Sequence, residues 1–309
     1  MRTGIRTPVL AHPRRVGVGL RRSLPVLGWL LPALVVIAFV IGYPVIQVII
    51  DSFTSKTRFD PGEFVALDNF TELMAGGDQD LFWLSFRNNL VLLVSIPATI
   101  LVGLVVSSIL YRGIRGSRLY EVFIFLPFLP AVAAISVIFI YLLGWEGPLN
   151  ETIRALSLEP LAQAWLTDPG LAIWSILGVV TWKRLGFVVL LFMARMLSID
   201  PDLLDAAAVD GATWSQTVRH VVVPEMRAII RFVGILGFIE VFSFTFAYVF
   251  VLTRGGPFKN TYTLEYLLFS IMFRRKLVGL ASAVAVLLLV LAVAVAVYQM
   301  RRARARVAT

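Results

Sequence analysis

The chain of 309 residues contains no cysteine and only two histidines. The absence of cysteine excludes a disulfide, a thiolate metal site and a cysteine nucleophile. His12 lies in a basic N-terminal stretch and His220 in a polar segment between two apolar runs, and neither has a second residue at metal-ligand spacing. We therefore predict that both histidines face solvent and that the chain itself binds no metal or cofactor.

The sequence also lacks the short motifs that carry much ATP and hydrolase chemistry. It has no G-x-x-x-x-G-K-[ST] phosphate-binding loop, no H-E-x-x-H zinc motif and no G-x-S-x-G nucleophile motif. We therefore do not expect the chain to hydrolyse ATP or to be an enzyme.

Charge is scarce and apolar residues are abundant. Charged residues make up 15% of the chain and hydrophobic residues 59%, whereas a soluble domain is about a quarter charged and about half apolar. Six apolar runs are each long enough to cross a bilayer as a helix; they cover residues 27–50, 89–110, 120–143, 171–196, 228–253 and 279–300. Pro97, Pro127 and Pro130 fall inside these runs, and bundled membrane helices tolerate them. The sequence predicts an all-α polytopic membrane protein with about six spans in one domain, 27–300.

Lysine and arginine indicate how the spans are oriented. The net charge is +9, and most basic residues fall in segments that are cytoplasmic if both termini are cytoplasmic. The tails 1–26 and 301–309 are basic and are expected to contact anionic membrane lipid. Because the basic residues are dispersed over short loops and tails, a nucleic-acid partner is not expected. The predicted outer segment 254–278 departs from the rule, since it contains Arg274, Arg275 and Lys276.

The polar segment after the fourth run begins with the signals of a short helix. Asp200 is a candidate N-cap, and Pro201 suits the first helical turn. Asp202 and Asp205 favour a helix N-terminus because of the helix dipole. Gly211 can end this helix in a left-handed conformation.

A second short helix is predicted directly after the first. Thr213 and Gln216 have the spacing of a capping box, and Pro224 is expected to end the helix. Residues 200–224, referred to below as the elbow, are therefore predicted to form a cytoplasmic helix–turn–helix.

Residues 205–224, DAAAVDGATWSQTVRHVVVP, resemble the EAA loop of ABC importer permeases. Ala206, Ala207, Gly211 and Pro224 match the pattern in place, and Asp205 stands where the pattern has glutamate. The resemblance implies that these five residues couple the chain to a cytoplasmic ATPase, by docking into a cleft and carrying its motion to the membrane helices. A salt bridge made by Asp205 would have a shorter reach, because aspartate is one methylene shorter.

Four other stretches are similar to carbohydrate-importer permeases of the maltose-transporter-like, binding-protein-dependent group. They are FVALDNF (64–70), LPFLPAVAAISVIFIYLLGWEGPLN (126–150), WKRLGF (182–187) and LTRGGPFKNTYTLEYLL (252–268). The resemblance implies a multi-pass protein of the bacterial inner membrane. It also implies a second homologous permease, two ATPase subunits that bind ATP and Mg, an external solute-binding protein and a sugar substrate.

Three charged residues lie where the bilayer interior is expected. Lys183 and Arg184 fall near the middle of the fourth run, and Glu240 falls near the middle of the fifth. A charge at that depth costs about 2.5–3.5 kcal/mol, so it usually faces a partner or a cavity. The matching depths predict a Lys183–Glu240 ion pair, with Arg184 as a second partner nearby.

Helical spacing groups further residues with Glu240 on one face of the fifth run, namely Gly237, Ser243, Phe244, Ala247 and Tyr248. Such a face could line a sugar path, with polar groups to hydrogen-bond the solute and an aromatic ring to stack on it. The candidate path residues are Lys183, Glu240, Ser243, Phe244 and Tyr248. The alternative is that they hold the helices together.

Three functions compete at this stage. The first is a permease subunit of a sugar importer. The second is an ABC permease for an amino acid, a peptide or an anion, which would also have the elbow but would match the outer loops less well. The third is a non-ABC channel or an intramembrane enzyme, and the enzyme would need a nucleophile or a metal cluster that the sequence lacks.

Overall fold

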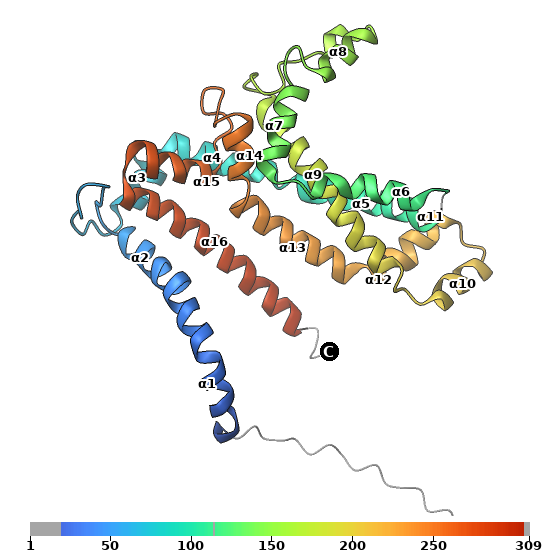
Figure 1. Cartoon of the computed structure of the whole chain (residues 1–309), viewed down its shortest axis with the longest axis horizontal. Helices are drawn as coiled ribbons and strands as arrows, with labels where there is room; N and C mark the ends of the chain where they lie inside the picture. The colour runs from blue at the N-terminus through green and yellow to red at the C-terminus, as the bar shows by residue number, and fades with distance from the viewer. Residues whose placement is uncertain (1–19, 114, 306–309) are drawn as a thin grey trace, which may run out of the picture. The chain divides into compact units, whose positions relative to one another are not determined.

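The computed structural model describes the backbone of residues 20–113 and 115–305 (Figure 1). His12, most of the tail 1–26 and the end of the tail 301–309 lie outside the described residues. The described chain is α-helical and contains only two isolated β-bridges, Thr54 with Phe64 and Thr57 with Leu277. The predicted all-α class is confirmed.

The first of two compact units ends at Val48 and is described here by itself. It contains α1 (Leu20–Ile37), a π-helical turn η1 (Ala38–Gly42) and the start of α2 (Tyr43–Asp51). Residues Trp29–Asp51 are long and apolar enough to cross a membrane, and their apolar side chains are exposed. A hydrogen-bonded helix with an exposed apolar surface suits a lipid-facing span, in agreement with the first predicted run.

The second unit, from Ile49 onward, has three long continuous spans. They are Gln79–Tyr111, made of α4 (Gln79–Leu92) and α5 (Ser95–Tyr111), then α9 (Ala172–Met196), and the Val278–Tyr298 part of α16 (Val278–Ala305). α5 and α9 pack closely where Gly103 faces Val188, since a Cβ at Gly103 would lie only 2.9 Å from Val188 Cγ1. Small residues permit such close approach of membrane helices.

Two further spans of this unit are broken. α6 (Ser117–Phe125) with the 3₁₀ turn η2 (Leu126–Phe128) meets α7 (Val132–Leu142) at 100°. α13 (Arg227–Ser243) meets α14 (Phe246–Leu252) at 51°. With each pair counted as one span, the described residues contain six spans, as predicted. The expectation that a single helix crosses over 120–143 is wrong, because two prolines within four residues remove backbone donors there.

The break in the fifth span has no proline, and side chains of other helices satisfy the freed backbone. The Val241 carbonyl accepts hydrogen bonds from Asn89 Nδ2 at 2.9 Å and from Thr245 Oγ1 at 3.1 Å. Thr245 Oγ1 lies 2.8 Å from Glu265 Oε1, and Asn89 Oδ1 accepts from the Leu264 amide at 2.8 Å. These contacts join α4, the α13–α14 break and α15 (Leu264–Phe269), and they stabilise the bent conformation because they pair the Val241 carbonyl at the break.

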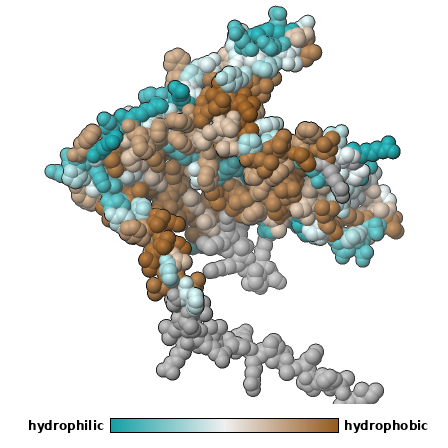
Figure 2. All heavy atoms as spheres, viewed as in Figure 1, coloured by the Kyte–Doolittle hydropathy of each residue, from teal (hydrophilic) through white to brown (hydrophobic). Residues whose placement is uncertain are grey.

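The remaining elements lie outside these spans. On the side of the chain predicted to be external are α3 (Asp68–Ala75), α8 (Pro148–Ala155), a 3₁₀ turn η3 (Glu159–Leu161), α15, and a π-helical turn η5 (Ser270–Arg275). The elbow contains α10 (Pro201–Val209), α11 (Trp214–Thr217), a π-helical turn η4 (Val218–Val222) and α12 (Val223–Glu225). Figure 2 shows apolar side chains over the middle of the second unit, and hydrophilic ones over α8, near α3 and around the elbow.

The basic segment 254–278, unexplained by the sequence, has partners within the second unit. Arg275 forms an ion pair with Asp78 at 2.7 Å. Arg274 Nη2 donates to the Tyr266 hydroxyl at 2.7 Å, and Lys276 lies 5.2 Å from the centre of the Phe59 ring. These three basic residues therefore contact loops and helices on the side predicted to be external.

Candidate functional site

The first helix of the elbow is formed by the residues that the sequence indicated. Asp200 Oδ1 accepts a hydrogen bond from the Asp202 amide at 3.1 Å, and Pro201 occupies the first turn. Gly211 has φ +70°, and its amide donates to the Ala208 carbonyl at 3.1 Å while the Ala212 amide donates to the Ala207 carbonyl at 3.0 Å. This pair of bonds is a Schellman motif, which requires the left-handed conformation that glycine adopts readily.

The second helix of the elbow begins as predicted but does not end as predicted. The Thr213 amide donates to Gln216 Oε1 at 2.8 Å, and the Gln216 amide to Thr213 Oγ1 at 3.4 Å, which completes the capping box. The helix then continues past Pro224, by way of η4 and α12, and ends at Glu225. The prediction that Pro224 ends this helix is wrong. The π-helical turn just before it shifts the hydrogen-bond pattern, so the missing proline donor breaks no regular i→i−4 ladder.

The tip of the elbow is exposed. Asp205, Ala206 and Gly211 are exposed, Ala207 is half-buried, and Val209 exposes 89% of its surface. Within the described part of the chain, the Asp205 carboxylate has no hydrogen-bond or ion-pair partner. The Val209 side chain and the Asp205 carboxylate are therefore both accessible at the tip.

The base of the elbow, in contrast, is packed against the membrane helices. An apolar cluster joins the end of α9 to η4, α12 and α13; its buried members are Val188, Phe192, Met196, Ile199, Val222, Met226 and Val233. The Trp214 ring stacks on Tyr111 of α5 with centroids 6.2 Å apart, and the Arg112 guanidinium lies 5.6 Å from the Trp214 ring. The elbow is therefore fixed to three membrane helices at one end and free at the other.

A second candidate site is a cavity of about 350 Å³ within the membrane helices. Its lining comes from α9, α13, α14 and the α6–α7 break, and comprises Phe128, Val132, Lys183, Arg184, Phe187, Val188, Val233, Leu236, Ile239, Glu240, Phe244 and Tyr248. Four of the five predicted path residues, Lys183, Glu240, Phe244 and Tyr248, thus come together. Ser243 is exposed and lies outside the cavity, although Phe244, directly after it, lines the cavity.

The charged pair in this cavity differs from the predicted one. Glu240 Oε2 pairs with Arg184 Nε at 3.4 Å. Lys183 Nζ instead donates to the Phe128 carbonyl at 2.9 Å and lies 5.1 Å from the centre of the Phe128 ring. The predicted Lys183–Glu240 pair is therefore wrong. Successive residues of a helix point about 100° apart, so only one of these two cations can face α13.

Gly237 explains why Arg184 is that cation. A Cβ at Gly237 would overlap the Arg184 guanidinium, so glycine leaves the space that the side chain occupies. Arg184 Nη2 donates to the Val233 carbonyl at 2.7 Å, while Nη1 is buried and has no partner among the described residues.

The remaining lining supplies aromatic rings and one accessible acceptor. Phe128, Phe187 and Phe244 contribute rings, and the Glu240 side chain is 30% exposed. Rings that stack and a carboxylate that accepts hydrogen bonds suit a polyhydroxylated solute. Phe128 and Phe187 were not predicted to line the cavity, since spacing along one helix gives no information about its neighbours.

The chain is similar to known proteins of one transport family. The family described as binding-protein-dependent transport system inner membrane component matches residues 95–307. A probable ABC transporter permease protein, PH1215 of Pyrococcus horikoshii, is 30% identical over 274 residues, which are 86% of this chain and 91% of that protein. The lactose transport system permease protein LacF of Rhizobium radiobacter is 27% identical over 263 residues, 82% of this chain and 86% of that protein.

A solved structure has the same fold. It is the crystal structure of a bacterial ABC transporter involved in the import of the acidic polysaccharide alginate. A chain of that structure matches with a TM-score of 0.77 and 18% identity, and the match covers 92% of this chain and 96% of that one.

Proposed function

This chain belongs to the family of binding-protein-dependent transport system inner membrane components, and from that premise we propose that it forms the membrane path for a sugar in an ATP-driven importer. The observation that carries the transport part of the proposal is the elbow, which is packed onto three membrane helices at its base and exposed at its tip. A device built in this way transmits movement between a cytoplasmic partner and the membrane.

The partner at the tip is a cytoplasmic ATPase. Val209 and the unpaired Asp205 carboxylate offer an apolar and an ionic contact side by side. Ala206 and Ala207 keep the helix surface low enough for close approach, while Gly211 sets the direction of the turn. Pro224 lies farther along, within the helix that returns to the membrane. In this proposal two ATPase subunits hold ATP and Mg, and a second, homologous permease completes the path.

An external solute-binding protein delivers the substrate in the same proposal. A neighbouring fold, that of the bacterial alginate ABC transporter in complex with an alginate pentasaccharide-bound periplasmic protein, has a TM-score of 0.76 and 18% identity. In this proposal the substrate arrives from outside the cell and both termini and the elbow of this chain lie in the cytoplasm, which the distribution of basic residues supports.

The substrate class rests on the cavity and on the relatives. The cavity presents the Phe244 ring, 64% exposed, and the partly exposed Glu240 carboxylate, to which a sugar can stack and hydrogen-bond. Lys183 and Tyr248 complete the polar part of this lining. Among the relatives are the lactose permease protein of Rhizobium radiobacter and the diacetylchitobiose uptake permease protein of Streptomyces coelicolor.

Purification of the tagged chain from its native membrane tests the proposal. We expect an ATPase and a second permease to co-purify, and the reconstituted complex to take up the ligand of its binding protein only when ATP is present. Mass spectrometry of the ligand on that binding protein should find a sugar, and an amino acid, a peptide or an inorganic anion would refute the substrate class. Uptake by the purified chain alone, without ATP, would refute the importer itself.

The cavity has its own test. Phe244→Ala and Glu240→Gln should lower uptake while the complex still assembles. Phe232→Ala is the matched control, because Phe232 lies on the same helix, is exposed and does not line the cavity. Equal uptake in the three variants would remove the cavity from the path.

A further inference from the structure

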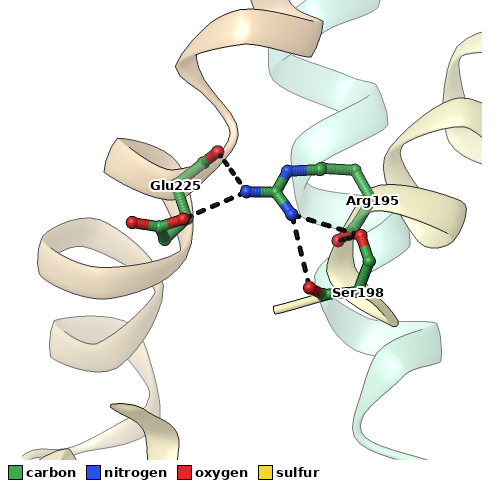
Figure 3. Close-up of polar contacts among 3 residues, drawn as sticks. All are labelled: Arg195, Ser198 and Glu225. Carbon is green, nitrogen blue, oxygen red and sulfur yellow. Dashed lines mark hydrogen bonds and ion pairs between the residues drawn. The ribbon is translucent and has the colours of Figure 1, made fainter. Parts of the chain in front are cut away.

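Arg195 is the residue that joins the two ends of the elbow (Figure 3). It lies in the last turn of α9, immediately before the chain leaves the membrane helices, and Glu225 lies at the end of α12, where the chain returns to them. The two residues are 30 positions apart in the sequence. Arg195 Nη2 donates to Glu225 Oε2 at 3.0 Å and to the Glu225 carbonyl at 3.1 Å.

The same guanidinium also contacts Ser198, in the segment that leads from α9 into the elbow. Arg195 Nη1 lies 3.2 Å from Ser198 Oγ and 3.4 Å from the Ser198 carbonyl, and Ser198 Oγ donates back to the Arg195 carbonyl at 2.7 Å. One planar group therefore contacts the segments on both sides of the elbow, including the backbone carbonyls of Ser198 and Glu225. Arginine suits this task because its donors form a rigid fork, whereas lysine offers a single point of charge. We call Arg195, Ser198 and Glu225 the clasp.

The clasp and the apolar cluster close the base of the elbow together. Met196 and Met226, the residues that directly follow Arg195 and Glu225, are almost fully buried in that cluster. The clasp itself is about one-third to one-half exposed, with side-chain exposures of 32% for Arg195 and 44% for Glu225. An ion pair in that position contributes little to the free energy of folding. Its role therefore concerns the relative position of the two segments that it joins.

We propose that Arg195 is a positioning residue for energy coupling, which holds the elbow at a fixed angle to α9 and α13. The inference rests on the proposed function, in which an ATPase moves the tip. A movement of the tip reaches α9 and α13 only if the two segments at the base of the elbow stay together. The polar contacts of Arg195 bridge these two segments and oppose their separation. Without the clasp, the apolar cluster still packs the base of the elbow, but the segments that contain Ser198 and Glu225 can move apart. The movement of the tip would then not reach α9 and α13.

The principal experiment compares uptake with ATP hydrolysis in the complete reconstituted complex. Arg195→Gln should leave assembly and ATP hydrolysis near the unmodified level and should lower the amount of solute taken up per ATP about fivefold or more. Glu225→Gln keeps the carbonyl contact and should have a smaller effect. Arg195→Lys should lie between Arg195→Gln and the unmodified complex. Arg231→Gln is the matched control, since Arg231 is exposed on α13 and its hydrogen bond is to a carbonyl of its own helix.

A second measurement does not depend on the ATPase. Because the chain has no cysteine, spin labels can be placed at Leu203 of α10 and Phe232 of α13, both exposed, in the full-length chain. Arg195→Gln should broaden the distribution of distances between the labels, and Arg231→Gln should not.

The outcomes separate the clasp from the proposed function. If the unmodified complex lacks an ATPase, the proposed function fails, and a broadened distance distribution in Arg195→Gln would still support the clasp as a geometric device. If the unmodified complex is coupled and Arg195→Gln leaves both coupling and the distance distribution unchanged, the clasp has no positioning role. If Arg195→Gln fails to assemble, Glu225→Gln decides by the same two measurements.

Discussion

Removal of the Glu240 carboxylate should destabilise the membrane domain because it leaves Arg184 buried without its counter-ion. Arg184 is 5% exposed, its Nη1 has no partner among the described residues, and Glu240 provides its ion pair at 3.4 Å. At an effective dielectric constant of about 20, that separation corresponds to a gross attraction of about 5 kcal/mol. Desolvation offsets much of this attraction in the folded protein, but the loss of one partner of a buried pair typically costs about 3–5 kcal/mol.

The lower end of that range is expected here, about 3 kcal/mol for Glu240→Leu, because the Glu240 side chain is 30% exposed and water can partly solvate the site. Glu240→Gln should cost less, since the amide oxygen still accepts a hydrogen bond. Arg184→Met should also destabilise, because Glu240 then lacks its partner and the Val233 carbonyl loses a donor. The double variant Arg184→Met with Glu240→Leu should be more stable than the sum of the two losses indicates, by about 1–3 kcal/mol.

The assay is a double-mutant cycle on the purified chain in detergent, with the midpoint of unfolding measured for the unmodified chain, each single variant and the double variant. A parallel cycle with Lys183→Met is the control, and it should be close to additive because Lys183 contacts the Phe128 carbonyl rather than Glu240. Stronger coupling of Glu240 to Lys183 than to Arg184 would refute the assignment of the pair.

Three further predictions concern topology, the elbow and Glu265 of α15, outside the spans. A single cysteine at Ala155 should react with a membrane-impermeant reagent added from outside, whereas one at Ser215 in the elbow should react only after permeabilisation; the reverse pattern would contradict the orientation. Gly211→Val should cost about 1–3 kcal/mol of local strain at φ +70° and weaken binding of the ATPase, while Gly211→Asn, which tolerates that region better, should retain it; equal ATPase recovery with both variants would argue against a conformational role. Burial raises the pKa of Glu265 above the usual range of glutamates, despite hydrogen bonds from its own backbone and neighbouring side chains, so the folded state binds the proton more tightly than the unfolded state. Stability from this residue should therefore be present at low pH and fall as the pH rises from the ordinary glutamate pKa through the raised one, and a thermal-unfolding profile of Glu265→Gln that kept the same fall would locate its origin elsewhere.

The elbow was predictable because each of its signals acts within a few residues. The N-cap at Asp200, the left-handed Gly211 and the capping box of Thr213 depend on contacts within a turn or two, so residue type and spacing are sufficient. Pro224 is the exception. A proline rule that is sound for a regular helix fails where a π-helical turn precedes the proline, and no local pattern indicated that turn.

The number of spans was also predictable, whereas their shapes were not. Length and hydropathy define a segment that can cross a bilayer, and six such segments are present when each bent pair counts as one. The break after Ser243 depends on other helices: Asn89 of α4 donates to the Val241 carbonyl that the break exposes, and Glu265 of α15 contacts the Thr245 hydroxyl beside it. Hydropathy along one segment contains no information about such partners.

The sequence by itself determined that this chain is a helical membrane protein with a helix–turn–helix elbow, because hydropathy and capping are properties of contiguous residues. Only the tertiary structure decided that Arg184 rather than Lys183 pairs with Glu240, that Ser243 lies outside the cavity, and that Arg195 meets Glu225, 30 positions further along the chain. These are contacts between helices distant in sequence. They depend on the rotation of each helix about its axis and on the space that a neighbour such as Gly237 leaves open, and packing alone sets both.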